Sequence, residues 1–129
     1  KQFWIRALNK TNTFFLSLQY FGQWVPDYDD RMSQLAPLYP NILVFPRLME
    51  TENVFTGILT TTYRNGTLTP QLALAYDVRG AWLVQPQMIF IREPFRFLVQ
   101  YSMIAGSFTN FGFFRDRDQI TFTFTYLLN

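Results

Sequence analysis

Strict alternation of apolar and uncharged polar residues constrains this chain more than any other feature. The clearest example runs from Ile120 to Tyr126, where Ile, Phe, Phe and Tyr alternate with threonines. Because successive side chains of a strand point to opposite faces, this period predicts a sheet with one apolar face. A water-soluble sheet usually covers its other face with charged residues, but here that face carries Thr, Gln, Ser and Ala. This layout is typical of a transmembrane β-barrel, with lipid outside and a polar lumen inside.

The same alternation predicts seven antiparallel strands. The first is weak, because Arg6 lies inside it and blurs the pattern. Pro70 and Pro86 fall within predicted strands, and since proline removes a ladder hydrogen bond we expect each at a bulge or near a strand end. The predicted strands are Phe3–Leu8, Thr13–Val25, Asn53–Arg64, Leu68–Asp77, Ala81–Arg92, Phe95–Ala105 and Gln119–Asn129.

The connections between these strands alternate between two kinds. Short turns are predicted at Lys10–Asn12, at Asn65-Gly66, whose type I′ turn needs positive φ at both residues, and at Glu93-Pro94. The other connections are Pro26–Thr51, Asp77–Gly80 and Gly106–Asp118, of which the first and last are long. Outer-membrane barrels have short periplasmic turns and longer extracellular loops, so the C-terminus is expected in the periplasm of a Gram-negative bacterium.

The expected fold is therefore all-β, an antiparallel up-and-down transmembrane barrel. Residues 1–129 form one domain with no separate second domain, and we expect them to be the C-terminal part, about seven strands, of a larger barrel. Bacterial barrels have even strand numbers from about eight upward, so N-terminal strands of the same barrel or a partner chain are expected to complete it. The alternative is a soluble sandwich with an aromatic core, which leaves the missing charges on the polar face unexplained.

The alternation assigns side chains to lipid or to lumen. Aromatic side chains on the lipid face are expected to form two girdles. The periplasmic girdle comprises Phe14, Tyr63, Phe90, Phe95 and Tyr126, and the extracellular one Trp24, Phe55, Tyr76, Trp82 and Phe122. Residues expected to face outer-membrane lipids are Leu72, Leu74, Val84, Met88, Val99, Phe122 and Phe124. Residues expected to face the lumen are Phe15, Gln19, Phe21, Gln23, Ile58, Thr60, Gln71, Gln85, Gln87, Ile89, Arg96, Gln100 and Ile104.

Composition excludes several classes of function. The chain has no Cys, which excludes disulfides and thiolate metal sites, and no His, the commonest general base and metal ligand. An enzyme is therefore not expected, and neither catalytic residues nor a cofactor or metal site are assigned. A net charge of +2 without a basic stripe gives no reason to expect nucleic-acid binding. The chain has no run of about eighteen apolar residues, so no transmembrane helix is expected. No signal peptide is visible, so the chain looks like a piece of a longer precursor.

Two clusters of charged residues each have a structural and a functional interpretation. Asp27, Asp29 and Asp30 could bind a cation such as Ca²⁺ through carboxylate oxygens, or simply form a solvated acidic loop. The run from Arg115 to Asp118 alternates in charge, which favours a salt-bridged loop base over a substrate site.

The predicted lumen is amphipathic and nearly neutral, which leaves two functions open. Its apolar patches either pack against a plug or a small barrel interior, or guide an apolar or amphiphilic solute. We therefore expect a channel or export component for hydrophobic or amphiphilic, lipid-like cargo. The alternative is a structural or adhesion barrel whose loop at 26–51 meets an external partner.

Two segments resemble a known family. The stretch from Trp4 to Lys10, followed by Thr13 to Gln19, is similar to the C-terminal half of the proteobacterial outer-membrane family catalogued as domain of unknown function 1302. The closing segment from Phe114 to Tyr126 resembles that family's last strand, although Leu128 and Asn129 stand where barrels usually end in Phe or Trp. The resemblance implies a longer barrel with a signal peptide, and export of lipids or other hydrophobic compounds together with an inner-membrane exporter and a periplasmic lipoprotein. It supplies no catalytic residues.

Overall fold

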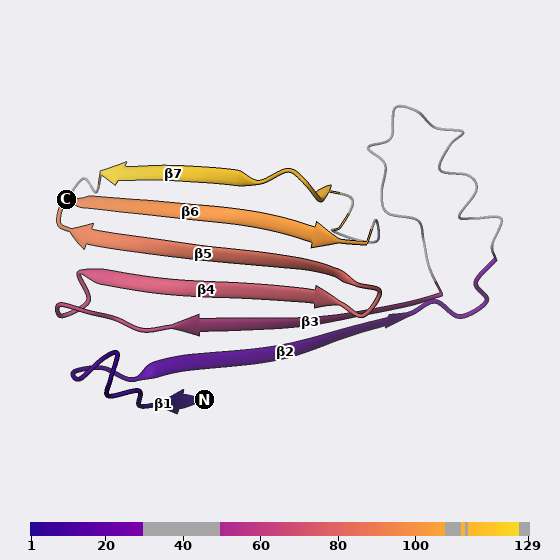
Figure 1. Ribbon diagram of the computed structural model, residues 1–129, viewed down its shortest axis with the longest axis horizontal. Coiled ribbons are helices and arrows are strands. Elements are labelled where there is room, and N and C mark those ends of the chain that lie inside the picture. Colours follow the sequence, from indigo (N-terminus) through magenta and orange to yellow (C-terminus); the bar gives the residue numbers. More distant parts are fainter. Residues whose placement is uncertain (30–49, 108–111, 113, 127–129) are drawn as a thin grey trace.

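The computed structural model describes residues 1–29, 50–107, 112 and 114–126, and they form a single sheet. Seven antiparallel strands lie side by side in chain order in one layer (Figure 1). They are β1 (Gln2–Phe3), β2 (Phe14–Trp24), β3 (Thr51–Thr60), β4 (Leu68–Asp77), β5 (Ala81–Arg92), β6 (Phe95–Gly106) and β7 (Gln119–Tyr126). The predicted all-β, up-and-down arrangement is confirmed, and the described strands form one layer instead of the two packed sheets of a sandwich.

The register keeps the same offset along every pair of neighbouring long strands. From Leu68↔Phe90 to Tyr76↔Trp82, for example, β4 and β5 pair without an inserted residue. The expectation of a bulge at Pro86 was therefore wrong, because the β5–β6 register is the same on both sides of it. Its missing N–H coincides with a local gap in that ladder, between the Val84↔Met103 and Gln87↔Gln100 pairs. Pro70 lies near the start of β4, as expected.

The Asn65-Gly66 signal locates a hairpin correctly but the loop is longer than two residues. Asn65 has φ of 55° and Gly66 of 87°, the positive values that the dipeptide predicts, and Arg64 adds a third at 50°. Tyr63 and Leu68 exchange backbone hydrogen bonds of 2.8 and 3.2 Å and close the loop. The predicted strand to Arg64 accordingly ends at Thr60, with one isolated bridge at Tyr63.

The predicted first strand is the largest error of secondary structure. Only Gln2–Phe3 pair with β2, and the chain then turns, with the N–H groups of Leu8 and Asn9 both bonded to the carbonyl of Ile5. Asn9, which is only 2% exposed, anchors this turn to the β3–β4 hairpin. Its amide nitrogen donates to the Thr61 hydroxyl at 2.9 Å and to the Thr62 carbonyl at 2.8 Å, so one polar side chain replaces several predicted ladder bonds.

The sheet is not closed, so the predicted barrel is present only as an open sheet. Beyond Leu16, which exchanges backbone hydrogen bonds with Lys1, no described residue pairs with the outer edge of β2. The outer edge of β7 is likewise free of a neighbouring strand within the described ranges. The turn side of the sheet carries the connections at 4–13, 61–67 and 93–94, and the loop side those at 25–50, 78–80 and 107–118. No described segment is a helix long and apolar enough to cross a membrane.

Candidate functional site

The register sorts the strand residues onto two faces. We call the apolar face the one that carries Leu18, Phe55, Leu74, Trp82 and Phe97, and the mixed face the one that carries their sequence neighbours. All residues expected to face lipid lie on the apolar face, and all those expected to face a lumen lie on the mixed face. Which environment meets each face stays a prediction.

Aromatic side chains form a continuous row across four strands on the loop side of the apolar face. Tyr20 pairs with Phe55, Phe55 with Tyr76, and Tyr76 with Trp82. The rings of Tyr20 and Phe55 are in contact, with centroids 5.0 Å apart. This loop-side aromatic row consists of residues that are distant in sequence and aligned by register alone.

A second aromatic group lies on the turn side of the same face. Phe90, Phe97 and Phe124 pair in register from β5 to β7, and Phe95 pairs with Tyr126 one row further out. The centroids of Phe97 and Phe124 are 4.9 Å apart. We call these five residues the turn-side aromatic rows.

Aliphatic residues separate the two aromatic groups. The rows between them contain Leu16, Leu18, Leu59, Leu72, Leu74, Val84, Met88 and Val99. Trp82 and Phe90 are eight positions apart on β5, which is about 26 Å of strand, or about 20 Å of depth at a tilt of about 40°. This is close to the apolar band of about 25 Å that outer-membrane barrels present to lipid. Phe122 departs from the expected girdle, because it pairs with Val99 among the aliphatic rows.

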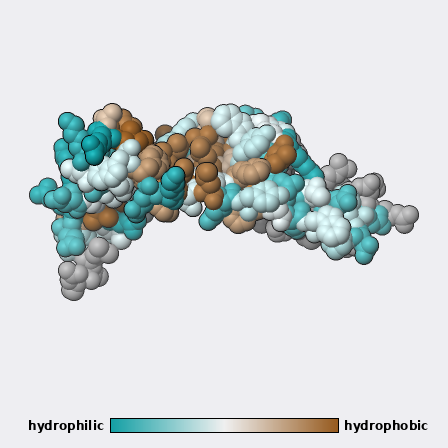
Figure 2. Space-filling view, turned by 90° about the horizontal axis from the view of Figure 1, so that it is seen from below, coloured by the Kyte–Doolittle hydropathy of each residue, from teal (hydrophilic) through white to brown (hydrophobic). Residues whose placement is uncertain are grey.

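The apolar face is largely uncovered. Phe122 is 75% exposed, Leu18 72% and Trp24 67%, and the described residues contribute only Phe14 and Ala81 as buried hydrophobic side chains. Seen toward the β1–β2 edge, the most hydrophobic residues gather over the middle of the molecule and hydrophilic ones toward its ends (Figure 2). An apolar surface that extends over a whole sheet face indicates contact with lipid or with another protein.

Two apolar grooves indent this face. The larger, of about 650 Å³, lies over Gly57, whose missing side chain leaves space between Leu18, Leu74 and Trp82. The smaller, of about 350 Å³, lies beside Pro70 and Pro86. Both are open, and their linings are mostly apolar.

Uncharged polar side chains form a row across the mixed face. Thr60 pairs with Gln71, Gln71 with Gln87, Gln87 with Gln100, and Gln100 with Thr121. Apolar pairs flank this row: Ile89 with Leu98 on the turn side and Leu83 with Ile104 on the loop side. The mixed face therefore combines this row with apolar pairs, and further polar side chains such as Gln19 and Thr123 lie outside the row.

Ser102 joins two of these amides. The Gln85 and Gln100 side chains both donate to its hydroxyl oxygen, at 3.0 and 3.1 Å, and Ser102 is only 8% exposed. The sequence assigned both glutamines to the lumen but gave Ser102 no role there. Ser102 follows Tyr101, so the alternation places its hydroxyl on the same face as Gln85 and Gln100. This position was the usable signal in the sequence.

Charged side chains within the strands stand only at strand ends. Glu52 and Arg96 are second in β3 and β6, and Asp77 and Arg92 are last in β4 and β5. Arg96, predicted to face the lumen, lies on the mixed face but is exposed at the turn side. Neither face therefore carries a charge at mid-strand among the described residues.

Small residues pack tightly at the loop side of β5 and β6. Ala81 is fully buried, and a Cβ on Gly112 would lie 2.7 Å from its Cβ atom. Gly106 has φ of 100°, and a Cβ there would lie 1.9 Å from the carbonyl oxygen of Gly80. This contact leaves room for glycine alone at position 106.

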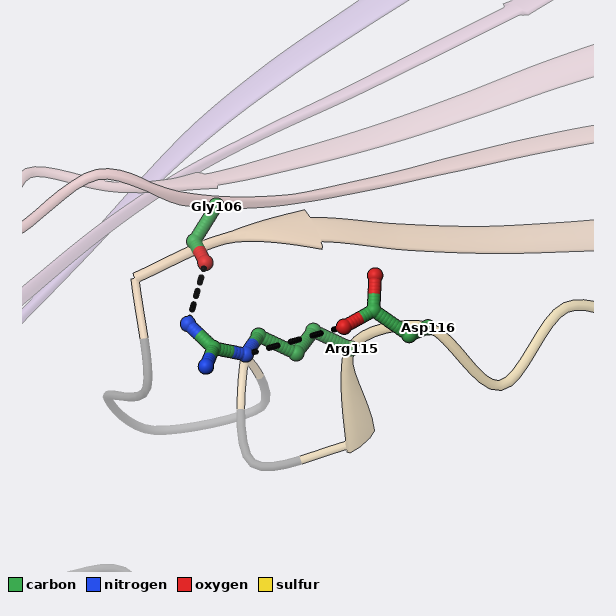
Figure 3. Close-up of polar contacts among 3 residues, drawn as sticks. All are labelled: Gly106, Arg115 and Asp116. Atoms are coloured by element: carbon green, nitrogen blue, oxygen red, sulfur yellow. Dashed lines mark hydrogen bonds and ion pairs between the residues drawn. The ribbon is translucent and has the colours of Figure 1, made fainter.

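The Arg115–Asp118 run forms part of a loop base. Arg115 donates to the carbonyl of Gly106 at 3.3 Å and lies 3.8 Å from the Asp116 carboxylate (Figure 3). Asp118 accepts a short hydrogen bond from the Tyr101 hydroxyl. The Arg115–Asp116 pair is exposed and contributes little stability, and its contacts tie the connection to the end of β6.

No metal centre is visible in the described ranges. No group of three acidic side chains is gathered there, and Asp27 and Asp29 are exposed. Asp30 and most of the loop at 26–51 lie outside the described residues, so the cation-binding and external-partner predictions for this loop stay predictions.

The comparisons with known proteins give no relative. A scan against family models finds no match, and searches of curated proteins and of solved structures find none either. The resemblance to the outer-membrane family therefore stays a prediction, and the function must be argued from the two faces.

Proposed function

We propose that this chain is part of an outer-membrane β-barrel that passes hydrophobic or amphiphilic compounds. The observation that carries the proposal is the apolar face, where aliphatic rows lie between aromatic rows at both ends. Lipid tails favour the aliphatic rows, and the lipid headgroup region favours Tyr, Trp and Phe.

The mixed face supports transport in preference to a purely structural role. It combines hydrogen-bonding amides with apolar pairs and has no mid-strand charge among the described residues. Rings of charged side chains would select ions, whereas a neutral amphipathic wall suits an uncharged or amphiphilic solute.

The free edges of β2 and β7 are where we expect the barrel to be completed. Unpaired N–H and C=O groups are costly in lipid, so both edges need strand partners in a membrane. N-terminal strands of the same barrel or a partner chain would supply them. An inner-membrane exporter and a periplasmic lipoprotein are further partners that the family resemblance implies.

Single-cysteine labelling tests the facing directly, because the chain contains no native Cys. Leu74→Cys and Gln87→Cys are compared in the intact protein in membranes, using a water-soluble maleimide. The expected result is labelling of position 87 and protection of position 74, with both sites reactive after denaturation. Equal labelling of the two folded variants would contradict the barrel.

Conductance then separates transport from the alternatives. The intact barrel in a planar bilayer is expected to pass only small ion currents, because its lumen is partly apolar. Large, weakly selective currents would indicate an ordinary aqueous porin. Absence of current together with no passage of an amphiphilic dye would favour the structural or adhesion barrel.

A further inference from the structure

Two glutamines on the mixed face have unused hydrogen-bonding capacity. Gln71 and Gln87 pair directly across β4 and β5, which places their side chains about 5 Å apart at the Cβ atoms. Neither amide hydrogen-bonds to another residue of the described ranges, and both are half-buried. A glutamine amide offers two donors and one acceptor oxygen, so this pair can both donate to and accept from a ligand.

The neighbouring cluster adds hydrogen-bonding groups of both kinds. Gln85 and Gln100 each use one of their two N–H donors on Ser102, and their carbonyl oxygens have no partner among the described residues. The four amides therefore offer both donors and acceptors to a ligand. A hydroxyl group, which donates and accepts at once, fits this set better than a group that only accepts.

Charged head groups fit the site poorly. A carboxylate only accepts hydrogen bonds, and the amide oxygens would face its negative charge. Arg96, on the same face, is four positions from Gln100 along β6, or about 13 Å, which is too far for an ion pair with a carboxylate at this site. An ammonium group would find acceptors but no mid-strand carboxylate, since Glu52 and Asp77 lie at strand ends.

Apolar surface lies on both sides of the polar row. The pairs Ile89–Leu98 and Leu83–Ile104 flank it along β5 and β6. A head group at Gln71 and Gln87 would leave an alkyl chain over one of these pairs, where burial of each CH₂ is favourable.

We infer that Gln71 and Gln87, beside the Ser102 cluster, bind the uncharged, hydroxylated head group of a single-chain amphiphile such as a monoacylglycerol. The inference rests on the proposed function, because it requires the mixed face to line the barrel interior. It adds the site within the wall and the chemistry of the head group.

The test uses Ala73→Cys as a reporter, because this small side chain neighbours Gln71 on the same face. The intact protein in nanodiscs is labelled with a water-soluble maleimide, alone or with monolaurin, laurate or laurylamine. At a concentration about nine times its Kd, monolaurin is expected to slow labelling about tenfold. A probe that lacks one or two net hydrogen bonds binds about tenfold more weakly, so the two charged probes at the same concentration should slow labelling less than about twofold.

Variants locate the effect. Gln71→Met combined with Gln87→Met keeps side-chain size and should abolish protection by monolaurin. Gln19→Met, a glutamine on the same face outside the paired row, should retain it. Heat-modifiable migration on gels confirms that each variant is folded, and the comparison of the three probes on the reporter alone needs neither glutamine variant.

The outcomes separate the two proposals. If the folded reporter is not labelled at all, the mixed face does not meet water and the proposed function fails. If it is labelled but monolaurin and laurate protect equally, or protection survives in the double variant, the function stands and the head-group site is wrong. Stronger protection by laurylamine would also overturn the inference, in favour of a cationic ligand.

Discussion

The two faces of this sheet share one backbone but present different chemistry. On the apolar face, aliphatic rows separate aromatic rows, and the mid-strand Tyr101 hydrogen-bonds to Asp118, which lies just before β7. On the mixed face, a row of amides crosses three strands from β4 to β6, and Ser102 joins Gln100 of this row to Gln85. Adjacent residues of one strand thus present different chemistry, which is what the proposed barrel requires, with lipid on one side and a partly wet interior on the other.

The sharpest test of this difference is a charge placed on each face. Leu74→Arg should cost about 2–4 kcal/mol of the free energy of folding into vesicles, because Leu74 lies in the aliphatic rows. Ala73→Arg is the matched control, adjacent in sequence on the mixed face, and its cost should be clearly smaller. Denaturant titration in lipid vesicles measures both. Equal costs would mean that the faces do not meet different solvents.

Hydrogen bonds between side chains on the mixed face should contribute to the folding stability of the barrel. Ser102→Ala removes the acceptor of two amide donors and should destabilise the folded barrel by about 1–3 kcal/mol. Ser17→Ala, on the same face in β2, removes a hydroxyl that makes no hydrogen bond to a described residue. In the same titration, Ser17→Ala should have nearly the folding stability of the wild type. A Ser102→Ala variant as stable as the wild type would show that water replaces the hydrogen bonds of the cluster.

The loss of folding free energy caused by a charge on the apolar face should depend on the depth of the residue in the membrane. Phe124 lies in the turn-side aromatic rows, so Phe124→Arg should cost only about 1 kcal/mol, less than Leu74→Arg. A cost equal to that of Leu74→Arg would place the aromatic rows at the middle of the membrane instead of at its boundary.

The smallest effect is expected in the Gly57 groove. A Cβ at this position would approach the Leu18 Cδ2 atom to 3.2 Å, a contact that a flexible side chain can relieve. Gly57→Ala should therefore change folding stability by no more than about 0.5 kcal/mol. A large loss would show that the backbone must remain open there for a close contact outside the described chain.

Alternation predicted most of the fold because β-strands have a fixed period. The facing of Leu74, Gln87 and their neighbours followed from that period alone. The hairpin at Asn65-Gly66 followed from the turn that this dipeptide favours. The alignment of residues across strands did not follow, since register depends on turn geometry that the dipeptide signal leaves open by one or two residues. The sequence placed Phe55, Tyr76 and Trp82 in one girdle, but their pairing with one another and with Tyr20 became visible only with the structure. The same holds for the Gln71–Gln87 pair.

The weakest prediction shows what a periodic pattern misses. The segment after Phe3 has apolar residues but folds as a turn, because Asn9 offers the backbone and the β3–β4 hairpin local hydrogen bonds that compete with a ladder. Ser102 was overlooked for a related reason: a lone serine gains meaning only when two amides converge on it. The Ser102 cluster depends on contacts between side chains of different strands, which a periodic pattern does not reveal.

The constant register offset has a consequence for how such a sequence can vary in length. Losing or gaining one residue within β4 would turn Leu72 and Leu74 inward and Gln71 and Ala73 outward along the remainder of the strand. With no bulge in the long-strand ladders to absorb the shift, single-residue insertions should survive only in the connections. Among relatives, lengths should therefore differ in the loops while the strands keep their residue counts, so that gaps in an alignment would mark the ends of the strands.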